Sequence, residues 1–277
     1  MMRVSAIMSI YKEPVQLLER SINSVLNQTY QSWELLVTID NPGNFEAISY
    51  IEGLSKLDSR ISYVVNQKNL GLGACKNNAI KIANGEFIAS QDADDISLPN
   101  RFQKQVNFLD NNPEVAMVGT ALIYRDLESQ ANIFTRIFPR IIDTEINKRT
   151  PCGHPSIMAR KDTFFKFGFY DTITVFANGE QAFCEDYDLW LRWYIAKVKI
   201  VNIEEPLIIY MRDLTKVGKA KAALKSVISI KKKYLPQLSF SISDYLYLYG
   251  QQIFSMMPSS MISSLFFISN KLKEKIS

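Results

Sequence analysis

The sequence has little of what marks several protein classes. Its 277 residues contain one histidine and three cysteines, and the net charge is only +4. The cysteines are odd in number and widely spaced, without a Cys-x-x-Cys pair, so no disulfide framework or metal knuckle is visible and reduced thiols are expected. The small net charge gives no argument for a nucleic-acid partner. We therefore expect a cytoplasmic protein that does not bind nucleic acid.

Long hydrophobic runs are also scarce. The apolar N-terminal stretch lacks a small-residue cleavage site and is closed by Lys12, Glu13 and Pro14, so we interpret residues 4–10 as a strand rather than a signal peptide. The apolar stretch at 253–268 is interrupted by Pro258 and falls short of the roughly twenty residues needed to span a bilayer. An apolar fraction of 47% nevertheless indicates a globular protein with a substantial core.

Strand and helix patterns alternate through the first half of the chain. Strands are expected at residues 4–10, 33–39, 61–65, 87–90 and 115–119, with helical patterns between them. This alternation predicts an α/β domain whose mostly parallel sheet carries helices on both faces. The second half is less regular, with a helix expected at 186–196 and two short strands at 199–203 and 207–210.

Two acidic clusters lie on either side of the only histidine. The first, at residues 92–95, follows an apolar strand, and the second, at 185–188, opens an apolar helix. A strand that ends in carboxylates presents them at the sheet edge where α/β folds bind ligands. Carboxylate oxygens suit Mg²⁺ or Mn²⁺ carrying a diphosphate. With a base supplied by the second cluster, the pattern indicates group transfer from a nucleotide donor.

Taken in order, these motifs resemble those of the bacterial inverting glycosyltransferases of the GT-A fold, glycosyltransferase family 2, which build O-antigen, capsule and exopolysaccharide. The matching blocks are residues 4–14, 24–30 (SVLNQTY), 33–35 (WEL), Asp40, 69–77 (NLGLGACKN), 92–95 (DADD), 153–156 (GHPS) and 185–192 (EDYDLWLR). The resemblance covers roughly residues 3–212. It implies a Rossmann-like, mostly parallel sheet flanked by helices over residues 1–213, and we expect a helical C-terminal region over 214–277.

The resemblance implies that a UDP-sugar is the donor. Asp40 matches the acid that binds uracil, although Asn41 stands where the family has a second acid. Lys76 stands in place of the usual Arg near the base, which keeps the charge but loses the planar fork. Gly71 is expected to let the backbone approach the nucleotide.

The same resemblance assigns the diphosphate side of the donor. Asp92 matches the acid near the ribose and diphosphate, and Asp94 matches the ligand of Mg²⁺ or Mn²⁺, a cation that stabilises the departing UDP as a Lewis acid. Arg212 follows a short strand and is a candidate partner of the diphosphate, with a surface ion pair as the alternative. Asp95 is expected instead at the start of the helix near Pro99.

On the acceptor side, Asp186 matches the general base that takes the proton of the attacking hydroxyl, and Glu185 is the second candidate. Asp188 and His154 are candidate acceptor contacts. Simpler interpretations stay open: Asp40 as the cap of a turn, Asp186 and Asp188 as ordinary acids at a helix N-terminus, and His154 as a loop residue bonded to backbone.

The C-terminal region combines apolar residues with lysines, among them Lys225, Lys231 and Lys271. This pattern predicts helices on an anionic membrane surface, with a hairpin covering the domain's own core as the alternative. We predict a metal-dependent, inverting hexosyltransferase that moves a hexose or N-acetylhexosamine from a UDP-sugar to a polyprenyl-diphosphate-linked saccharide, peripheral on the inner face of the cell membrane. The rivals are a nucleotidyltransferase acting on sugar phosphates and a non-catalytic protein that binds nucleotide sugars.

Overall fold

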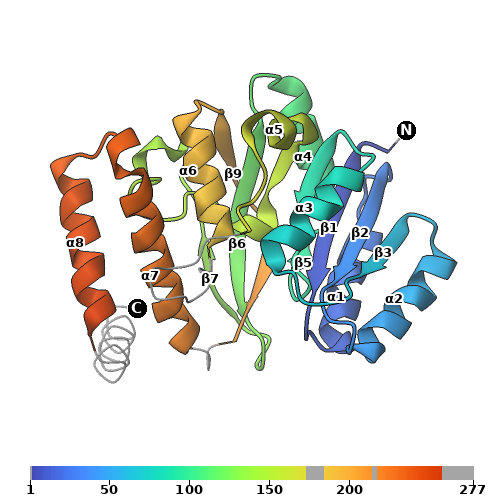
Figure 1. Cartoon of the computed structure of the whole chain (residues 1–277). Helices are drawn as coiled ribbons and strands as arrows, with labels where there is room; N and C mark the ends of the chain where they lie inside the picture. The colour runs from blue at the N-terminus through green and yellow to red at the C-terminus, as the bar shows by residue number, and fades with distance from the viewer. Residues whose placement is uncertain (1, 173–183, 214–216, 258–277) are drawn as a thin grey trace. The chain divides into compact units, whose positions relative to one another are not determined.

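A computed structural model describes residues 2–172, 184–213 and 217–257 of the chain (Figure 1). The chain divides into two compact units. The first contains residues 1–146, 150–174 and 185–214, and the second contains residues 147–149, 175–184 and 215–277.

The first unit begins with a parallel half-sheet, at the blue end of the colour scale in Figure 1. Its strands, in spatial order, are β3 (Ile61–Val65), β2 (Trp33–Ile39), β1 (Val4–Ile10) and β4 (Phe87–Ser90). The connecting helices are α1 (Val15–Leu26), α2 (Phe45–Leu57) and α3 (Leu72–Ile82). Strand β2 is buried at every residue because helices cover both faces, and its residues are apolar except for Glu34 and Thr38. The predicted parallel sheet flanked by helices is confirmed here.

The sheet continues with strands of mixed direction. From β4 outward come β8 (Met158–Arg160), β6 (Met117–Asp126), β9 (Ile200–Arg212) and β5 (Ile96–Ser97), while β7 (Asn132–Arg136) pairs with β6. Strands β6 and β9 are parallel, and the other pairs in this half are antiparallel. Helices α4 (Arg101–Asn111), α5 (Lys161–Phe167) and α6 (Glu185–Ile195) complete the described part of this unit, with short 3-10 turns at Ile142–Thr144 and His154–Ser156.

The two short strands expected at 199–203 and 207–210 are one strand, β9. Its register against β6 shifts at the point where Ile203 faces Thr120 and Pro206 faces Ala121. Pro206 has no N–H to donate, and an irregularity in the ladder accommodates such a residue. The sequence Glu204-Glu205-Pro206 therefore interrupts the apolar pattern without ending the strand.

The second unit is a helical pair. Helix α7 (Val217–Tyr234) lies beside α8 (Ile242–Met256), with a 3-10 turn at Leu235–Gln237 between them (Figure 1). Buried Lys231 of α7 donates hydrogen bonds to the Lys148 carbonyl and to Gln251 Oε1, at 2.5 and 2.6 Å, which ties residues 147–149 to both helices. The predicted C-terminal helices are thus present. No helix in the described part of the chain is long and apolar enough to cross a membrane.

Candidate active site

Asp40 directly follows β2 and organises the loop before α3. Its carboxylate accepts hydrogen bonds from Asn66 Nδ2 at 2.7 Å and from the backbone N–H groups of Leu70 and Gly71, both at 2.9 Å. Gly71 has φ of +84°, a conformation that L side chains rarely adopt, so glycine is needed where the loop turns into the helix. The structure therefore places two predicted donor residues, Asp40 and Gly71, in direct contact.

The first acidic cluster follows β4, which lies next to β1 in the parallel half-sheet. Asp92 and Asp94 are both half-buried, whereas Asp95 is fully buried and accepts the backbone N–H of Met211 at 2.9 Å. Asp95 does not start a helix as expected, since α4 begins only at Arg101. It connects the acidic loop to β9 instead.

Arg101 stabilises the start of this loop by hydrogen bonding. It is fully buried and donates hydrogen bonds to the carbonyl groups of Ser90 and Ile157, at 2.8 and 3.1 Å. It also donates to Ser97 Oγ at 2.9 Å and to Gln91 Oε1 at 3.2 Å. Burial lowers the pKa of its guanidinium to about 9, while Asp92 and Asp95 favour the charged form. Arg101 is thus a positioning residue that fixes the end of β4, and the motif analysis did not identify it.

His154 lies at the centre of the site. Its ring nitrogens are 3.2 Å from Ser90 Oγ and 2.9 Å from Tyr170 OH, and its ring stacks on Trp190 of α6 with centroids 6.0 Å apart. Asp92 Oδ1 is 3.9 Å from its Nδ1. Burial and the charges of Lys76 and Arg101 hold the pKa of His154 well below its usual range. The imidazole is therefore neutral, and the bonds it makes are with side chains rather than backbone.

Lys76 joins His154 to the second acidic cluster. Its Nζ lies 3.3 and 3.4 Å from the two ring nitrogens of His154 and 3.4 Å from Glu185 Oε1. The side chain is almost fully buried, with 6% of it exposed, so this ammonium group acts where solvent screens it little. Through Lys76 and His154 the structure brings Asp92 and Glu185, which are far apart in sequence, to one place.

Asp186 opens α6 beside Glu185 and accepts the backbone N–H of Tyr187 at 2.7 Å. Burial and the neighbouring Glu185 charge raise the pKa of Asp186 from its usual 3.8 to about 6, against the opposing effect of Lys76. Burial also raises the pKa of Asp92, opposed by Lys76 and reinforced by Glu185. A carboxylate with a pKa near 6 can take a proton at neutral pH and hold it better than an ordinary aspartate.

Tyr170 is a site residue that the motif analysis missed. Asn77 holds its backbone, since Nδ2 donates to the Tyr170 carbonyl at 2.8 Å and Oδ1 accepts the Tyr170 N–H at 3.0 Å. Gly73 lets this segment approach α3, because a Cβ there would lie 2.9 Å from the Asp171 carbonyl oxygen. Gly73 and Asn77 of the 69–77 block thus position Tyr170. These two residues are the only feature of the motif that could have pointed to Tyr170 from the sequence.

Two further predicted residues are Asp188 and Arg212. Asp188 is fully buried and accepts a hydrogen bond from Arg192 Nε at 2.7 Å, one turn along α6, which favours a structural role. Arg212 is exposed at the end of β9, one residue beyond Met211 and its hydrogen bond to Asp95. The structure thus places Arg212 near the first acidic cluster, whereas the carboxylate of Asp188 forms an ion pair within its own helix.

The carboxylates of the first acidic cluster suit a divalent cation that binds together with a diphosphate. The described residues include no group of three or more histidine, cysteine, aspartate or glutamate side chains that could hold a metal by themselves. Mg²⁺ is commonly held by one or two carboxylates together with substrate phosphates. Half-buried Asp94, with Asp92 two residues before it, fits that arrangement.

The chain is similar in sequence to known glycosyltransferases. Glycosyl transferase family 2 matches residues 5–173. The putative glycosyltransferase EpsE of Bacillus subtilis is 30% identical over 264 residues, 94% of this chain and 92% of EpsE. The O-antigen biosynthesis glycosyltransferase WbnJ of Escherichia coli is 31% identical over 194 residues, 68% of this chain and 70% of WbnJ.

The fold is similar to those of solved glycosyltransferase structures. Residues 1–349 of S. aureus TarS in complex with UDP-GlcNAc give a TM-score of 0.65 at 15% identity, over 89% of this chain and 70% of that one. The longer TarS chain is covered to only 41%. The mannosyltransferase PcManGT from Pyrobaculum calidifontis, in complex with GDP-Man and Mn²⁺, gives 0.63 at 15% identity, over 91% and 69%. The predicted GT-A fold is confirmed. The chain belongs to glycosyl transferase family 2, and it is a glycosyltransferase.

Proposed function

We propose that this glycosyltransferase transfers a hexose or N-acetylhexosamine from a UDP-sugar, with inversion and with a divalent cation, to a saccharide acceptor carried on polyprenyl diphosphate. The observation that carries the proposal is the contact of the two acidic clusters through Lys76 and His154. This contact provides both a place for a charged donor and a base for the acceptor. The name of WbnJ supports a role in building surface polysaccharide.

On the donor side, we assign Asp40 and Gly71 to the nucleobase, and Asp92 and Asp94 to the ribose, diphosphate and cation. Lys76 contacts His154 and Glu185, and its ring contact with Tyr170 is at 5.3 Å. We assign its charge to the diphosphate side of the donor rather than to the base. Asp94 would hold a divalent cation, which would supply Lewis-acid stabilisation of the negative charge on the departing UDP. Arg212 adds a positive charge at the edge of the same cluster.

On the acceptor side, Asp186 takes the proton. The acceptor oxygen forms a bond to the anomeric carbon while the bond from that carbon to the β-phosphate oxygen breaks, and the electron pair leaves with UDP. The hydroxyl proton passes to the Asp186 carboxylate, which its raised pKa suits. A single displacement inverts the anomeric centre and needs no covalent enzyme intermediate. Neutral His154 orients the acceptor or a phosphate oxygen by hydrogen bonding.

Both rival functions lose support. A nucleotidyltransferase would need a glycine-rich phosphate loop with a basic residue right after the first strand, whereas β1 is followed by Tyr11, Lys12, Glu13 and Pro14, and Glu13 accepts the N–H groups of Tyr11 and Lys12. A non-catalytic binding protein would have no use for a half-buried carboxylate with a raised pKa beside a second acid.

We expect purified protein to release UDP from at least one UDP-sugar, and to do so only with Mn²⁺ or Mg²⁺ present. A panel of UDP-sugars, assayed with a synthetic lipid-diphosphate acceptor, measures this release. NMR of the product should then show an anomeric configuration opposite to that of the donor. Retention of configuration, or release that survives a metal chelator, would contradict the proposal.

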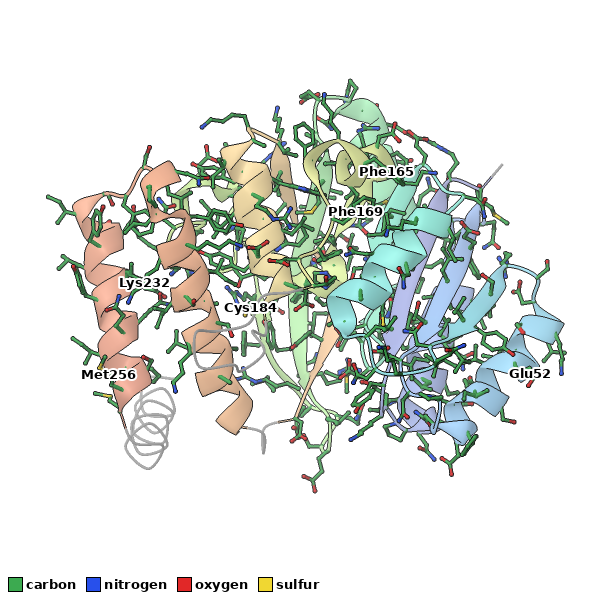
Figure 2. The ribbon with its side chains drawn as sticks, viewed as in Figure 1. Glu52, Phe165, Phe169, Cys184, Lys232 and Met256 are labelled. Atoms are coloured by element: carbon green, nitrogen blue, oxygen red, sulfur yellow. The ribbon has the colours of Figure 1, made fainter. Side chains whose placement is uncertain are left out.

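We also propose that the second unit contacts an anionic membrane surface. Helix α8 carries an exposed apolar stripe at helical spacing, formed by Ile242, Leu246, Tyr249, Ile253 and Met256, with exposures from 60% to 81%. Met256 points away from α7 in Figure 2. The last turn of α7 carries Lys232 and Lys233, both exposed, which complement anionic headgroups.

Leu246→Glu is expected to weaken binding to phosphatidylglycerol-containing vesicles by about tenfold, because it loses the burial of a leucine side chain. Cosedimentation measures the bound fraction. Ser243→Glu adds the same charge to α8 outside the stripe and serves as the control. Equal loss in both variants, or no binding by the unmodified protein, would exclude the stripe as a membrane contact.

A further inference from the structure

Three aromatic side chains form a row across neighbouring strands of the first unit. Tyr124 of β6 faces Phe134 of β7 on one side and Tyr210 of β9 on the other in the strand registers. The rings of Tyr124 and Phe134 are stacked, with centroids 4.4 Å apart and planes 13° apart. The rings of Tyr124 and Tyr210 lie 5.0 Å apart at 56°. We call Phe134, Tyr124 and Tyr210 the aromatic row.

The aromatic row is not part of the closed core. Tyr124 and Tyr210 are half-buried and pack on the small cluster of Leu122, Phe138 and Ile208, whereas 45% of Phe134 is exposed. Stacking on Tyr124 fixes the ring of Phe134 without covering it. The row is therefore a rigid aromatic surface that is supported from one side and open at one end.

The other end of the row adjoins the first acidic cluster. Met211, next to Tyr210 in β9, donates its N–H to Asp95, and Ile209 on the other side pairs with Ile96 of β5. Burial raises the pKa of the Tyr210 hydroxyl, and the charges of Asp95, Asp92 and Asp94 raise it further. Tyr210 therefore lies near the carboxylates that we assign to the nucleotide-sugar donor.

The row also lies near the loop that carries His154. Arg136 lies two residues after Phe134 on β7, facing Leu122, and its guanidinium lies over the Phe138 ring, 4.5 Å from the ring centroid. Leu122, which Arg136 faces, packs against Gly153, where an added Cβ would lie 2.5 Å from Leu122 Cδ1. A ligand on the row would therefore lie between the acidic loop at one end and the loop that carries His154.

We propose that the aromatic row is a stacking platform for a pyranose ring of the acceptor saccharide. The proposal rests on the glycosyl transfer proposed above. A pyranose has one face lined by C–H groups of slight positive charge, and the face of an aromatic ring carries negative charge, so the two attract. The tyrosine hydroxyls add hydrogen-bonding groups at the rim, which an all-hydrocarbon surface for a lipid chain would not need.

Sugar binding can be measured without turnover. We would record saturation-transfer NMR on a panel of methyl pyranosides of glucose, galactose, mannose, N-acetylglucosamine and N-acetylgalactosamine. At least one should receive saturation, strongest on the C–H protons of one ring face. Phe134→Leu keeps an apolar side chain but removes the aromatic face, and we expect roughly fivefold weaker sugar affinity. Phe134→Trp should retain binding.

Ile133→Ala is the matched control, because Ile133 is similarly exposed, at 42%, on the opposite face of β7. It should leave sugar affinity unchanged. Absence of binding by every pyranoside, or unchanged affinity in Phe134→Leu, would overturn the proposal. Farnesyl diphosphate binding that depends on Phe134, without pyranoside binding, would assign the row to the lipid and also overturn it. Calorimetry of UDP binding runs in parallel, so failure of the platform and failure of the donor site are distinguished.

Discussion

Asp186→Asn is expected to lower the rate of sugar transfer by about 10²–10⁴-fold while leaving affinity for UDP almost unchanged. An amide has the shape of the carboxylate but cannot take the proton of the attacking hydroxyl. Steady-state kinetics with acceptor and calorimetry with UDP measure the two quantities. Glu185→Gln is the control, with a smaller expected loss, because Glu185 contacts Lys76 and shifts the pKa of its neighbour. Equal losses of transfer and of UDP affinity in Asp186→Asn would argue against the base role.

The pH profile gives the same assignment an independent readout. Because burial and Glu185 raise the pKa of Asp186 to about 6, the acid limb of kcat/KM in the unmodified protein should fall with an apparent pKa near 6. An ordinary aspartate would leave the rate flat down to pH of about 4. Glu185→Gln removes a negative neighbour and should shift this limb to lower pH.

The raised pKa also predicts the sign of a stability change. The folded state holds the Asp186 proton more tightly than the unfolded state does, so this stabilisation is complete below the usual pKa of 3.8 and is lost as the pH rises toward about 6. At neutral pH the ionised carboxylate is therefore a net cost to folding. Asp186→Asn should raise the free energy of unfolding there by about 1–2 kcal/mol, allowing for partial exposure. A variant that is inactive because it is unfolded would show the opposite sign.

Asp94→Asn should lower kcat/KM by about 10²–10³-fold, because charge stabilisation by a bound cation amounts to several kcal/mol. Asparagine keeps the size of the side chain but loses the negative charge that a hard cation requires. Asp94→Glu keeps that charge and should retain part of the activity.

A readout besides activity is Mn²⁺ binding followed by electron paramagnetic resonance, with and without UDP. The unmodified protein should bind Mn²⁺ more tightly when UDP is present, and Asp94→Asn should lose this dependence. Undiminished coupling between Mn²⁺ and UDP in Asp94→Asn would assign the cation to other residues.

The sequence predicted those parts of the fold that depend on local pattern. The β1 to β4 strands with their intervening helices follow from apolar runs and helical spacing, and Asp40 and Asp92 follow from their places after strands. The order of strands in a parallel sheet then brings such residues to one edge. His154 was a candidate acceptor contact from its motif, but its particular partners were not predictable, because they depend on how β8 and α6 pack.

The rest could not be predicted because it depends on partners distant in sequence. Strand β9 continues through Pro206 only because β6 and β5 pair with its two flanks. Tyr170 reaches His154 because Asn77 of α3 holds its backbone. The aromatic row exists only in the registers of three strands, and no sequence spacing relates residues 124, 134 and 210.

The central claim is that one site holds a cation on Asp94 and keeps Asp186 free to act as base. Crystals of the protein grown with Mn²⁺ and UDP test it through anomalous scattering at the manganese edge. The account predicts a manganese peak in contact with Asp94 and with phosphate oxygens, with no metal bond to Asp186. A peak ligated by Asp186, or one away from Asp94, would contradict it.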